Sequence, residues 1–390
     1  MTARAWLLKI RSYVAWQTKR MVRAPSTLVN VLLGTVWYDL VLARRKRVYR
    51  GVVPESTRVA VYLIYPVHGL LESHIKALAH FLEHGYAPII ISNLTLNLGD
   101  RERLLACAHT LIERPNYGYD FGGYRDGLLF LSDRLHTLDR LVLMNDSVWF
   151  PVASCPHWLP AAEAKELDVV GAVANCFNDP FGMQEDASGA LSWYYDADHP
   201  RFHYCSFALS FGPAVLNDPR FLGFWKRLKL SNDKYVTIQR GEVGLGQWIV
   251  HSGHSHGCTL DVSRLDADLD RLSDERLRVV AKHLVIPEDR GLRLRKAAVL
   301  APSTNKPGDR LRVRNFILQA VAETGPAYAL LEFALMDKGH AFVKKSPLWL
   351  EPEGAEITLR LLSELGEDGF HSEARALVHQ RGCAAEVHAT

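Results

Sequence analysis

Two apolar runs separated by a helical pattern constrain this fold more than any other feature of the sequence. Val59–Tyr65 and Ala87–Asn93 are rich in β-branched and aromatic residues, as buried strands are. Between them, Glu72–His84 has helical spacing and ends at Gly85. A strand, a helix and a second strand in so short a span form a βαβ unit, which implies a parallel sheet and a right-handed crossover. The sequence therefore predicts an α/β fold.

The alternation of strands and helices continues along the chain. Further strands are predicted at Leu138–Met144, Asp168–Ala174 and Phe207–Phe211, and further helices at Asp100–Ile112, Gly127–Leu135 and Phe221–Leu230. Polar clusters follow strands at 65–68, 92–93 and 145–147. Such clusters predict a doubly wound sheet, flanked by helices, that binds its ligand at the carboxyl edge.

Length and charge divide the chain into three parts. A chain of 390 residues is long enough for about two domains with appendages. Residues 1–50 hold eleven Lys and Arg against one acid, Asp39, although the whole chain carries only +3. After about residue 285 the pattern becomes basic and helical. We predict basic amphipathic helices over 1–50, the α/β domain over 51–285 and a mostly helical region over 286–390.

The pattern of the N-terminal part predicts a surface that binds an anionic membrane. Ala5–Arg23 alternates an apolar stripe with cations, which suits a helix lying among anionic lipid head groups. The alternative is an amphipathic helix docked on its own domain. Lys9 and Arg11 interrupt any signal-peptide core, and no apolar segment is long enough to span a bilayer. With six scattered cysteines and no CxxC pair, a cytoplasmic protein is expected, and no motif indicates a nucleic-acid partner.

Two short motifs carry the chemistry. Asn116–Arg125 reads NYGYDFGGYR, in which glycines allow close backbone approach and aromatics offer stacking surfaces, a composition typical of a binding loop. Asn145–Ser147 follows a strand and places a carboxylate where it can hold a cation against a diphosphate or bind a sugar hydroxyl. The dinucleotide fingerprint, the P-loop, the esterase elbow and the HExxH zinc motif are all absent.

These motifs resemble a known family. The run from Asn116 to Gly127, followed by Leu143–Ser147, is similar to the paired motif of the rhamnan synthesis protein F family, bacterial glycosyltransferases that build rhamnose-containing polysaccharides. The similarity covers most of residues 58–346 and ends in Gly339–Ser346, an apolar segment closed by basic residues. The chain departs from the family at His203–Ser206, where Gln is common, and at Trp149–Pro151, where Gly-Pro is common.

The resemblance implies a glycosyltransferase-A-like domain and an inverting rhamnosyltransferase. The implied donor is deoxythymidine diphosphate rhamnose, and the implied acceptor is a lipid-linked cell-surface polysaccharide or O-antigen at the inner face of the bacterial plasma membrane. A donor carrying guanosine or uridine diphosphate is an alternative. A non-catalytic glycan-binding or scaffold subunit is a second alternative, from a different class.

Roles can be given to individual residues on this basis. We expect the following to bind the donor: Tyr65, Asn93, Asn116, Tyr119, Asp120, Arg125, Asn145 and Ser147. Arg125 would face the diphosphate or hold Asp120, unless the two pair only to shape the loop. Asp146 would lie beneath the diphosphate and the sugar.

The general base and the metal are less constrained. Glu242 matches a late acidic position of the family between glycines that could admit a substrate, with Asp196 and Asp198 as rivals and a surface Glu as the alternative. Asp146, joined by His254 or His256, could hold Mg²⁺ or Mn²⁺. Because Asn145–Ser147 offers one carboxylate, metal dependence stays open.

Overall fold

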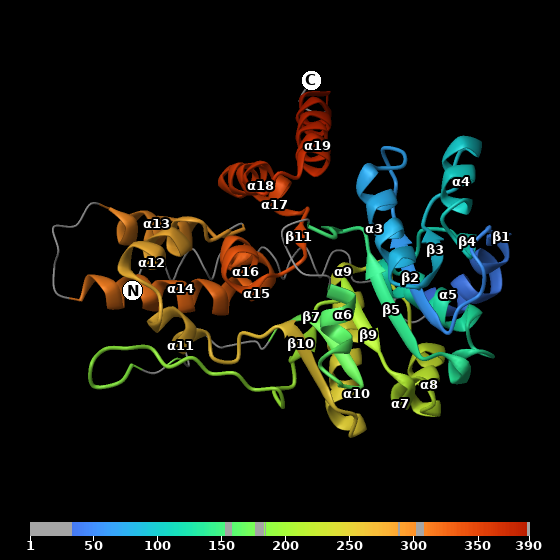
Figure 1. Ribbon diagram of the computed structural model, residues 1–390, viewed down its shortest axis with the longest axis horizontal. Helices are drawn as coiled ribbons and strands as arrows, with labels where there is room; N and C mark the ends of the chain where they lie inside the picture. The colour runs from blue at the N-terminus through green and yellow to red at the C-terminus, as the bar shows by residue number, and fades with distance from the viewer. Residues whose placement is uncertain are drawn as a thin grey trace.

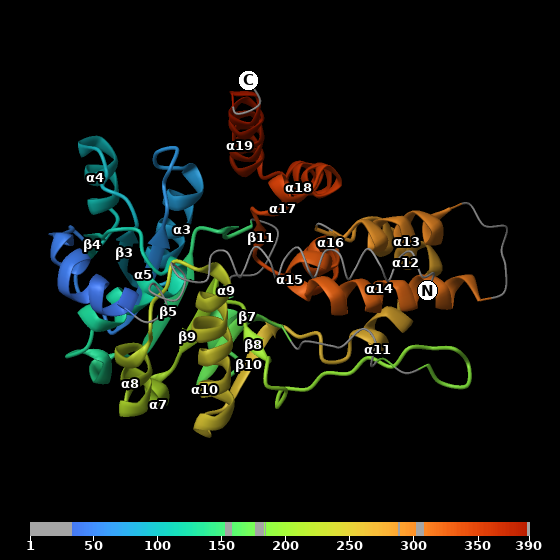
Figure 2. The same ribbon diagram turned by 180° about the vertical axis from the view of Figure 1, so that it is seen from behind.

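The computed structural model describes residues 33–152, 158–175, 183, 185–287, 289–301 and 308–387. It has a mixed α/β fold in which a nine-stranded sheet and its flanking helices occupy one end and a helical region occupies the other (Figure 1, Figure 2). The predicted helix over Ala5–Arg23 lies outside the described residues. The domain boundaries near residues 50 and 285 stay predictions. Among the described residues, no helix combines the length and the apolar character that crossing a bilayer requires.

The central sheet is mixed, with both parallel and antiparallel strand pairs. Its strands are β1 (Arg47–Arg50), β2 (Arg58–Ile64), β3 (Ala87–Ser92), β4 (Thr110–Glu113), β5 (Arg140–Asn145), β7 (Val169–Asn175), β8 (His203–Tyr204), β9 (Ala208–Phe211) and β10 (His256–Leu260). The order is β1-β4-β3-β2-β5-β9-β7-β10, with β8 beside β7. β9 runs antiparallel to both β5 and β7, and β1 runs antiparallel to β4. The carboxyl ends of β2, β3, β4 and β5 therefore share one edge.

The predicted strands before residue 175 are confirmed to within two residues at each end, but two predicted helices are partly wrong. Gly127–Leu135 is α-helical only as far as Phe130. Asp100–Ile112 was expected to be a single helix, whereas α4 (Leu98–Leu105) stops early and Thr110–Glu113 forms β4. All four residues of β4 are buried, and three pair with Ile89, Ile90 and Ile91 of β3. A strand this short leaves little periodicity to distinguish it from the last turn of the preceding helix.

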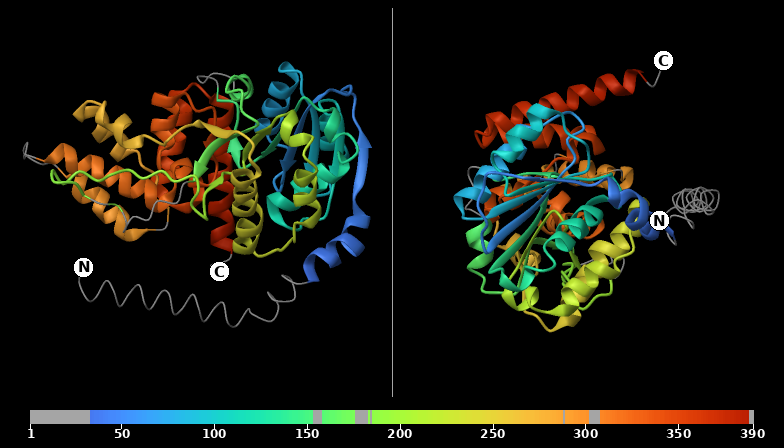
Figure 3. Two further views of the ribbon diagram at one scale, coloured as in Figure 1. Left: turned by 90° about the horizontal axis from the view of Figure 1, so that it is seen from below. Right: turned by 90° about the vertical axis from the view of Figure 1, so that its right-hand side faces the viewer.

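The sheet is covered on both faces, as Figure 3 shows. α3 (Glu72–Glu83) packs on the face of Tyr62, whose ring contacts His74 and Phe81. α5 (Tyr119–Phe130) packs on the opposite face, because Val61 and Leu63 alternate with Tyr62 along the strand.

The expected binding loop at Asn116–Arg125 is mostly helix. After Gly118, with φ of 80°, the chain enters α5 at Tyr119. A Cβ atom on Gly123 would lie 2.5 Å from Leu63, and one on Gly127 would lie 2.7 Å from Val61. The glycines therefore let the helix approach the sheet, which outweighs their low helix propensity.

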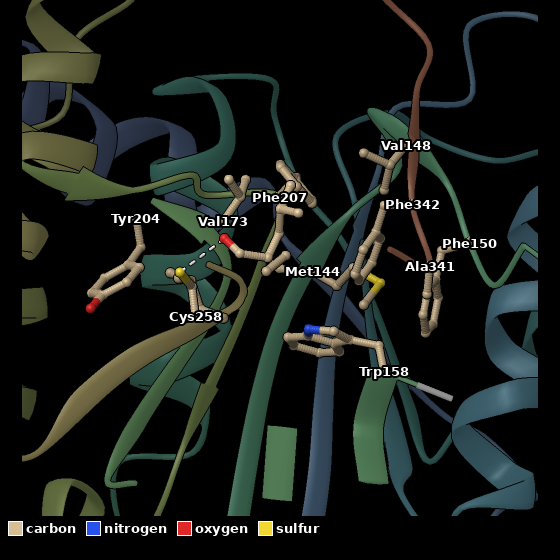
Figure 4. Packing of buried hydrophobic residues seen from close by; sticks show 14 of the residues in the cluster. Met144, Val148, Phe150, Trp158, Val173, Tyr204, Phe207, Cys258, Ala341 and Phe342 are labelled. Atoms are coloured by element: carbon tan, nitrogen blue, oxygen red, sulfur yellow. Dashed lines mark hydrogen bonds between the residues drawn. The ribbon is translucent and has the colours of Figure 1, made fainter. Parts of the chain in front are cut away.

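The C-terminal region is helical and returns to the sheet. Its elements are α11 (Leu265–Asp270), α12 (Asp274–Lys282), α13 (Arg290–Leu300), α14 (Asp309–Thr324), α15 (Pro326–Ala329), α16 (Leu331–Lys338), β11 (Val343–Lys344), α17 (Pro347–Leu350), α18 (Pro352–Glu364) and α19 (Asp368–Val387). β11 pairs antiparallel with β6 (Val148–Trp149), directly after β5. Phe342 stacks on Phe150 at 4.7 Å between ring centroids, inside the core shown in Figure 4.

Candidate functional site

Two carboxylates meet at one serine beside the carboxyl end of β5. Ser206 precedes β9, and its Oγ lies 3.2 Å from Asp120 Oδ2 and within hydrogen-bond distance of Glu242 Oε1. The Ser206 backbone N–H also donates to Glu242 Oε1 at 3.3 Å. One hydroxyl proton can serve only one carboxylate at a time, so the two acids are coupled.

The environment of Asp120 favours its neutral form. Burial and the nearby Glu242 carboxylate raise the pKa of Asp120 to about 6. Asn145 Nδ2 donates to Asp120 Oδ2 at 3.0 Å, and Asn145 Oδ1 accepts from the Ser147 hydroxyl at 2.6 Å. The structure thus brings Asp120, Asn145, Ser147 and Glu242 into one hydrogen-bonded network.

Asp146 stays ionised at the next position along the chain. Its Oδ2 accepts from the Tyr65 backbone N–H at 2.7 Å and lies 3.1 Å from His74 Nε2. Burial acts to raise the pKa of Asp146, but His74, Lys345 and the Tyr65 N–H outweigh it, so the pKa is lowered. Tyr65 itself is exposed and follows β2, the neighbour of β5 in the sheet.

Glu242 lies in a helical turn and not in the expected loop. η4 (Ile238–Val243) is a π-helical turn that continues directly into α10 (Gly244–Ser252). Gly241 allows this turn to rest on the Phe121 ring, because a Cβ atom there would overlap the ring. Gly241 therefore serves close packing and does not open a loop. The rival acids Asp196 and Asp198 lie in a separate turn, where Asp196 Oδ1 accepts from the Asp198 N–H at 2.9 Å.

Asn93 and Asn116 come together in a second place, at the carboxyl ends of β3 and β4. Both line a pocket of about 290 Å³ whose wall also includes Arg45, Arg47 and Arg114. Arg114 Nη1 donates to Asn93 Oδ1, and Asn116 is exposed. The wall is polar and mostly basic, and its acidic member Glu113 is paired with Arg101 at 2.7 Å. Tyr119 lies apart from it, with its hydroxyl 3.2 Å from the Asn232 carbonyl oxygen.

The expected role of Arg125 at the diphosphate or beside Asp120 is wrong. Its guanidinium donates to both carboxylate oxygens of Asp39, at 2.7 and 2.9 Å, and to the Trp225 carbonyl at 3.2 Å. Five residues along a helix turn the side chain by about 140°. Asp120 and Arg125 therefore point to different sides of α5, and Arg125 anchors the N-terminal segment.

The expected cation site of Asp146 and His254 is not assembled. His254 Nε2 lies 3.0 Å from Asp218 Oδ2, and its loop precedes β10 at the amino edge of the sheet, a strand length of about 20 Å from the edge that carries Asp146. In the described part of the chain, one group of three ligand side chains has its donor atoms within 4.8 Å, namely His80, Glu83 and His84 on α3. Among the described residues, the carboxylates at the β5 edge are therefore not part of a group of three such donor side chains.

Four residues at this edge were not assigned to the site from the sequence. His74 lies in the first turn of α3 and meets Asp146 only through the fold. Ser206 lies inside the family-like stretch before β9, but its two acidic partners are remote in sequence. Lys344 ends β11 and Lys345 follows it, and the Lys345 N–H donates to the Ser147 carbonyl at 2.9 Å. The basic residues that end the Gly339–Ser346 segment were the sequence signal that could have identified these two lysines.

The raised pKa of Asp120 predicts a pH-dependent stability. The folded chain holds this proton more tightly than the unfolded chain, so the free energy of unfolding should fall as pH rises from about 4 to above 6. Asp120→Asn removes this term. Urea unfolding at pH 4 and pH 7.5 measures the free energy of unfolding of both proteins. As pH rises, that of wild type should fall by up to about 3 kcal/mol more than that of the variant. Parallel stability curves for the two proteins would contradict the raised pKa.

Comparison with known sequences confirms the resemblance. The model of a family described as rhamnan synthesis protein F matches residues 88–291, just over half of the chain. A curated relative, "Uncharacterized protein y4gN" of Sinorhizobium fredii (strain NBRC 101917 / NGR234), is 35% identical over 209 residues. The match covers 53% of this chain and 50% of the relative, so the chain spans about half the length of the curated relative it matches.

Solved structures give only weak similarity. The mannosyltransferase Ktr4p from S. cerevisiae is 10% identical with a TM-score of 0.25, over 47% of this chain and 63% of that one. Core-mannan synthase A from Aspergillus fumigatus, in its Mn/GDP form, is 11% identical with a TM-score of 0.26, over 46% and 66%. At these TM-scores the likeness carries no argument about function.

Proposed function

This chain belongs to the rhamnan synthesis protein F family, and on that premise we propose that it is an inverting glycosyltransferase with a nucleotide diphosphate sugar as donor. The observation that carries the proposal is the network of Asp120, Ser206 and Glu242 beside Asp146 at the carboxyl edge of β5. It offers a coupled pair of acids next to an ionised carboxylate. This edge is where open α/β sheets bind their ligands.

In the proposed reaction Glu242 is the general base. An acceptor hydroxyl attacks the anomeric carbon of the sugar, and its proton passes to the Glu242 carboxylate. The bond from that carbon to the diphosphate breaks, and the nucleoside diphosphate leaves with the electron pair. Ser206 orients the base, and Asp120 and Asn145 support the serine from the other side.

Membership in the family supports a choice of donor and acceptor. We assign deoxythymidine diphosphate rhamnose as donor and a lipid-linked polysaccharide or O-antigen as acceptor. The polar and basic pocket lined by Asn93, Asn116 and Arg114 would receive part of the nucleotide. A fold of the glycosyltransferase-A type is part of the same proposal.

Isothermal titration of the purified full chain tests the class and the donor together. Thymidine, guanosine and uridine diphosphates and their sugars form the panel, and the expected result is micromolar binding of a thymidine species, about −8 kcal/mol. Preferred binding of a guanosine or uridine species would keep the enzyme and change its donor. The absence of binding throughout would favour the non-catalytic scaffold.

An exposed apolar face near the N-terminus supports a membrane partner. Residues 33–37 are helical and continue into η1 (Tyr38–Leu42), whose inner side holds Tyr38 stacked on Tyr117. The outer side presents Leu33, Val36, Trp37 and Leu40, which are 53–58% exposed at helical spacing. The exposed cations Arg44, Arg45 and Arg47 follow. This helix docks through its polar and aromatic side and leaves its apolar side free, as an interfacial helix does.

Flotation with vesicles containing phosphatidylglycerol tests this surface. The triple variant Leu33→Ser, Trp37→Ser and Leu40→Ser should lower the bound fraction about tenfold or more, because it removes apolar area from the membrane face. Leu294→Ser on α13, which is 62% exposed, is the matched control and should bind as wild type does. Unchanged flotation of the triple variant would exclude this face as the membrane contact.

A further inference from the structure

A strand from near the end of the chain brings a lysine to the candidate site. β11 pairs with β6, and the register places Lys344 opposite Val148, immediately after Asn145–Ser147. Phe342, two residues earlier, contacts the rings of Phe150 and Phe207 at 4.7 and 5.3 Å between centroids (Figure 4). Lys344 is therefore held by backbone pairing and by the aromatic core, and not by a free loop.

Lys344 is the last residue of β11 and Lys345 follows it, but the two side chains have different surroundings. Lys345 is buried and pairs with Glu373 at 3.0 Å. No ion pair within the described residues includes Lys344, whose Nζ lies 4.4 Å from the centroid of the Phe207 ring and 5.3 Å from that of Tyr328. Phe207 directly follows Ser206, so the Lys344 ammonium lies beside the acidic network. Its charge opposes the burial that raises the pKa of Asp120.

The carboxylates of the site are already engaged by protein donors. Asp146 Oδ2 holds the Tyr65 N–H and His74, and Asp120 Oδ2 holds Asn145 and Ser206. Among the described residues, these acids are not part of a group of three ligand side chains whose donor atoms lie within 4.8 Å of one another. A nucleoside diphosphate nevertheless needs positive charge as it leaves, and an ammonium group provides it as a point charge.

We propose that Lys344 binds the diphosphate of the donor directly, so that nucleotide binding in this chain does not require a divalent cation. The inference rests on the proposed function and deepens it. It gives the C-terminal region a part in the site, because β11 reaches the sheet from the helices on either side of it. The aromatic rings of Phe207 and Tyr328 position the ammonium on one side and leave its donors to the anion.

Titration of the full chain with the nucleoside diphosphate that binds best tests the proposal. It is carried out once in EDTA and once in manganese. Wild type should bind equally well in both buffers, and Lys344→Met should bind about tenfold or more weakly in both. Lys344→Arg keeps the charge and should retain most of the affinity. Lys338→Met on α16, which removes an ion pair with Asp268 of α11, is the control and should bind as wild type does.

Each other outcome separates the inference from the function on which it rests. If EDTA abolishes binding by wild type and manganese restores it, the inference is wrong and the glycosyltransferase proposal stands. Wild-type affinity in Lys344→Met would also overturn the inference. If no nucleotide binds in either buffer, the proposed function fails first. Thermal unfolding checks the fold of each variant, and Lys344→Gln, which keeps a polar side chain of similar length, replaces Lys344→Met if the latter unfolds.

Discussion

Glu242→Gln is expected to lower the rate of sugar transfer by about 10²–10⁴-fold. Glutamine keeps the shape of the side chain and can still accept from the Ser206 hydroxyl and N–H, so the turn η4 should persist. It cannot take a proton from the acceptor hydroxyl. The loss corresponds to about 3–5 kcal/mol of transition-state stabilisation, and it should appear in kcat with little change in nucleotide affinity.

The control for this experiment is Glu356→Gln, an equally conservative change at an exposed position on α18. It should transfer sugar at the wild-type rate. Transfer by Glu242→Gln within about threefold of wild type would show that the base is another group. Asp120 is then the next candidate, because it shares Ser206 with Glu242 and its pKa is raised to about 6, near the range in which a base works best.

The part of the site that the sequence predicts best is the edge at β2 and β5. Buried parallel strands read as continuous apolar runs, so Val59–Tyr65 and Leu138–Met144 could be placed to within two residues. Once two neighbouring strands are placed, the residues that follow them must meet at one edge. Tyr65 and Asp146 do meet there, through a hydrogen bond of 2.7 Å.

Glycine was the main source of error. A glycine read from sequence indicates freedom of the backbone, but at Gly123 and Gly241 it provides room for a neighbouring side chain. Both segments are therefore helical where loops were expected. The misplaced role of Arg125 follows from the same error, because a loop does not fix the direction of a side chain, whereas a helix turns Arg125 away from Asp120 and towards Asp39.

The rest of the site could not be predicted because it depends on tertiary packing. β11 has two residues, and nothing in so short a segment shows that it pairs with β6. Its place depends on the packing of Phe342 against Phe150 and Phe207, which local periodicity does not encode. Similarity to the family drew attention to Gly339–Ser346, but only the fold shows that its lysines lie beside Asn145–Ser147.

Lys345→Met is expected to lower the free energy of unfolding by about 3–5 kcal/mol, the usual cost of removing one partner of a buried ion pair. Lys345 and Glu373 each expose 6% of their side chains and lie 3.0 Å apart. Glu373 also accepts from the Ser73 N–H and from Trp149 Nε1, so the pair joins β11, α3, β6 and α19. Urea unfolding measures the loss. Arg271→Met removes an exposed pair with Asp268 and should cost less than about 1 kcal/mol.

The pH dependence of this loss identifies the charge as its cause. Burial acts to raise the pKa of Glu373, but Lys345 and the Ser73 donors outweigh it, so the pKa is lowered in the folded chain. The pair therefore stabilises the fold above the ordinary pKa of a glutamate, about 4.3, and loses its effect as pH falls through the lowered value. The gap between wild type and Lys345→Met should narrow over that range, because a protonated Glu373 no longer needs a cation. A gap that does not narrow as pH falls would mean that Lys345 stabilises the fold through its contact with the Trp149 ring and not through its pair with Glu373.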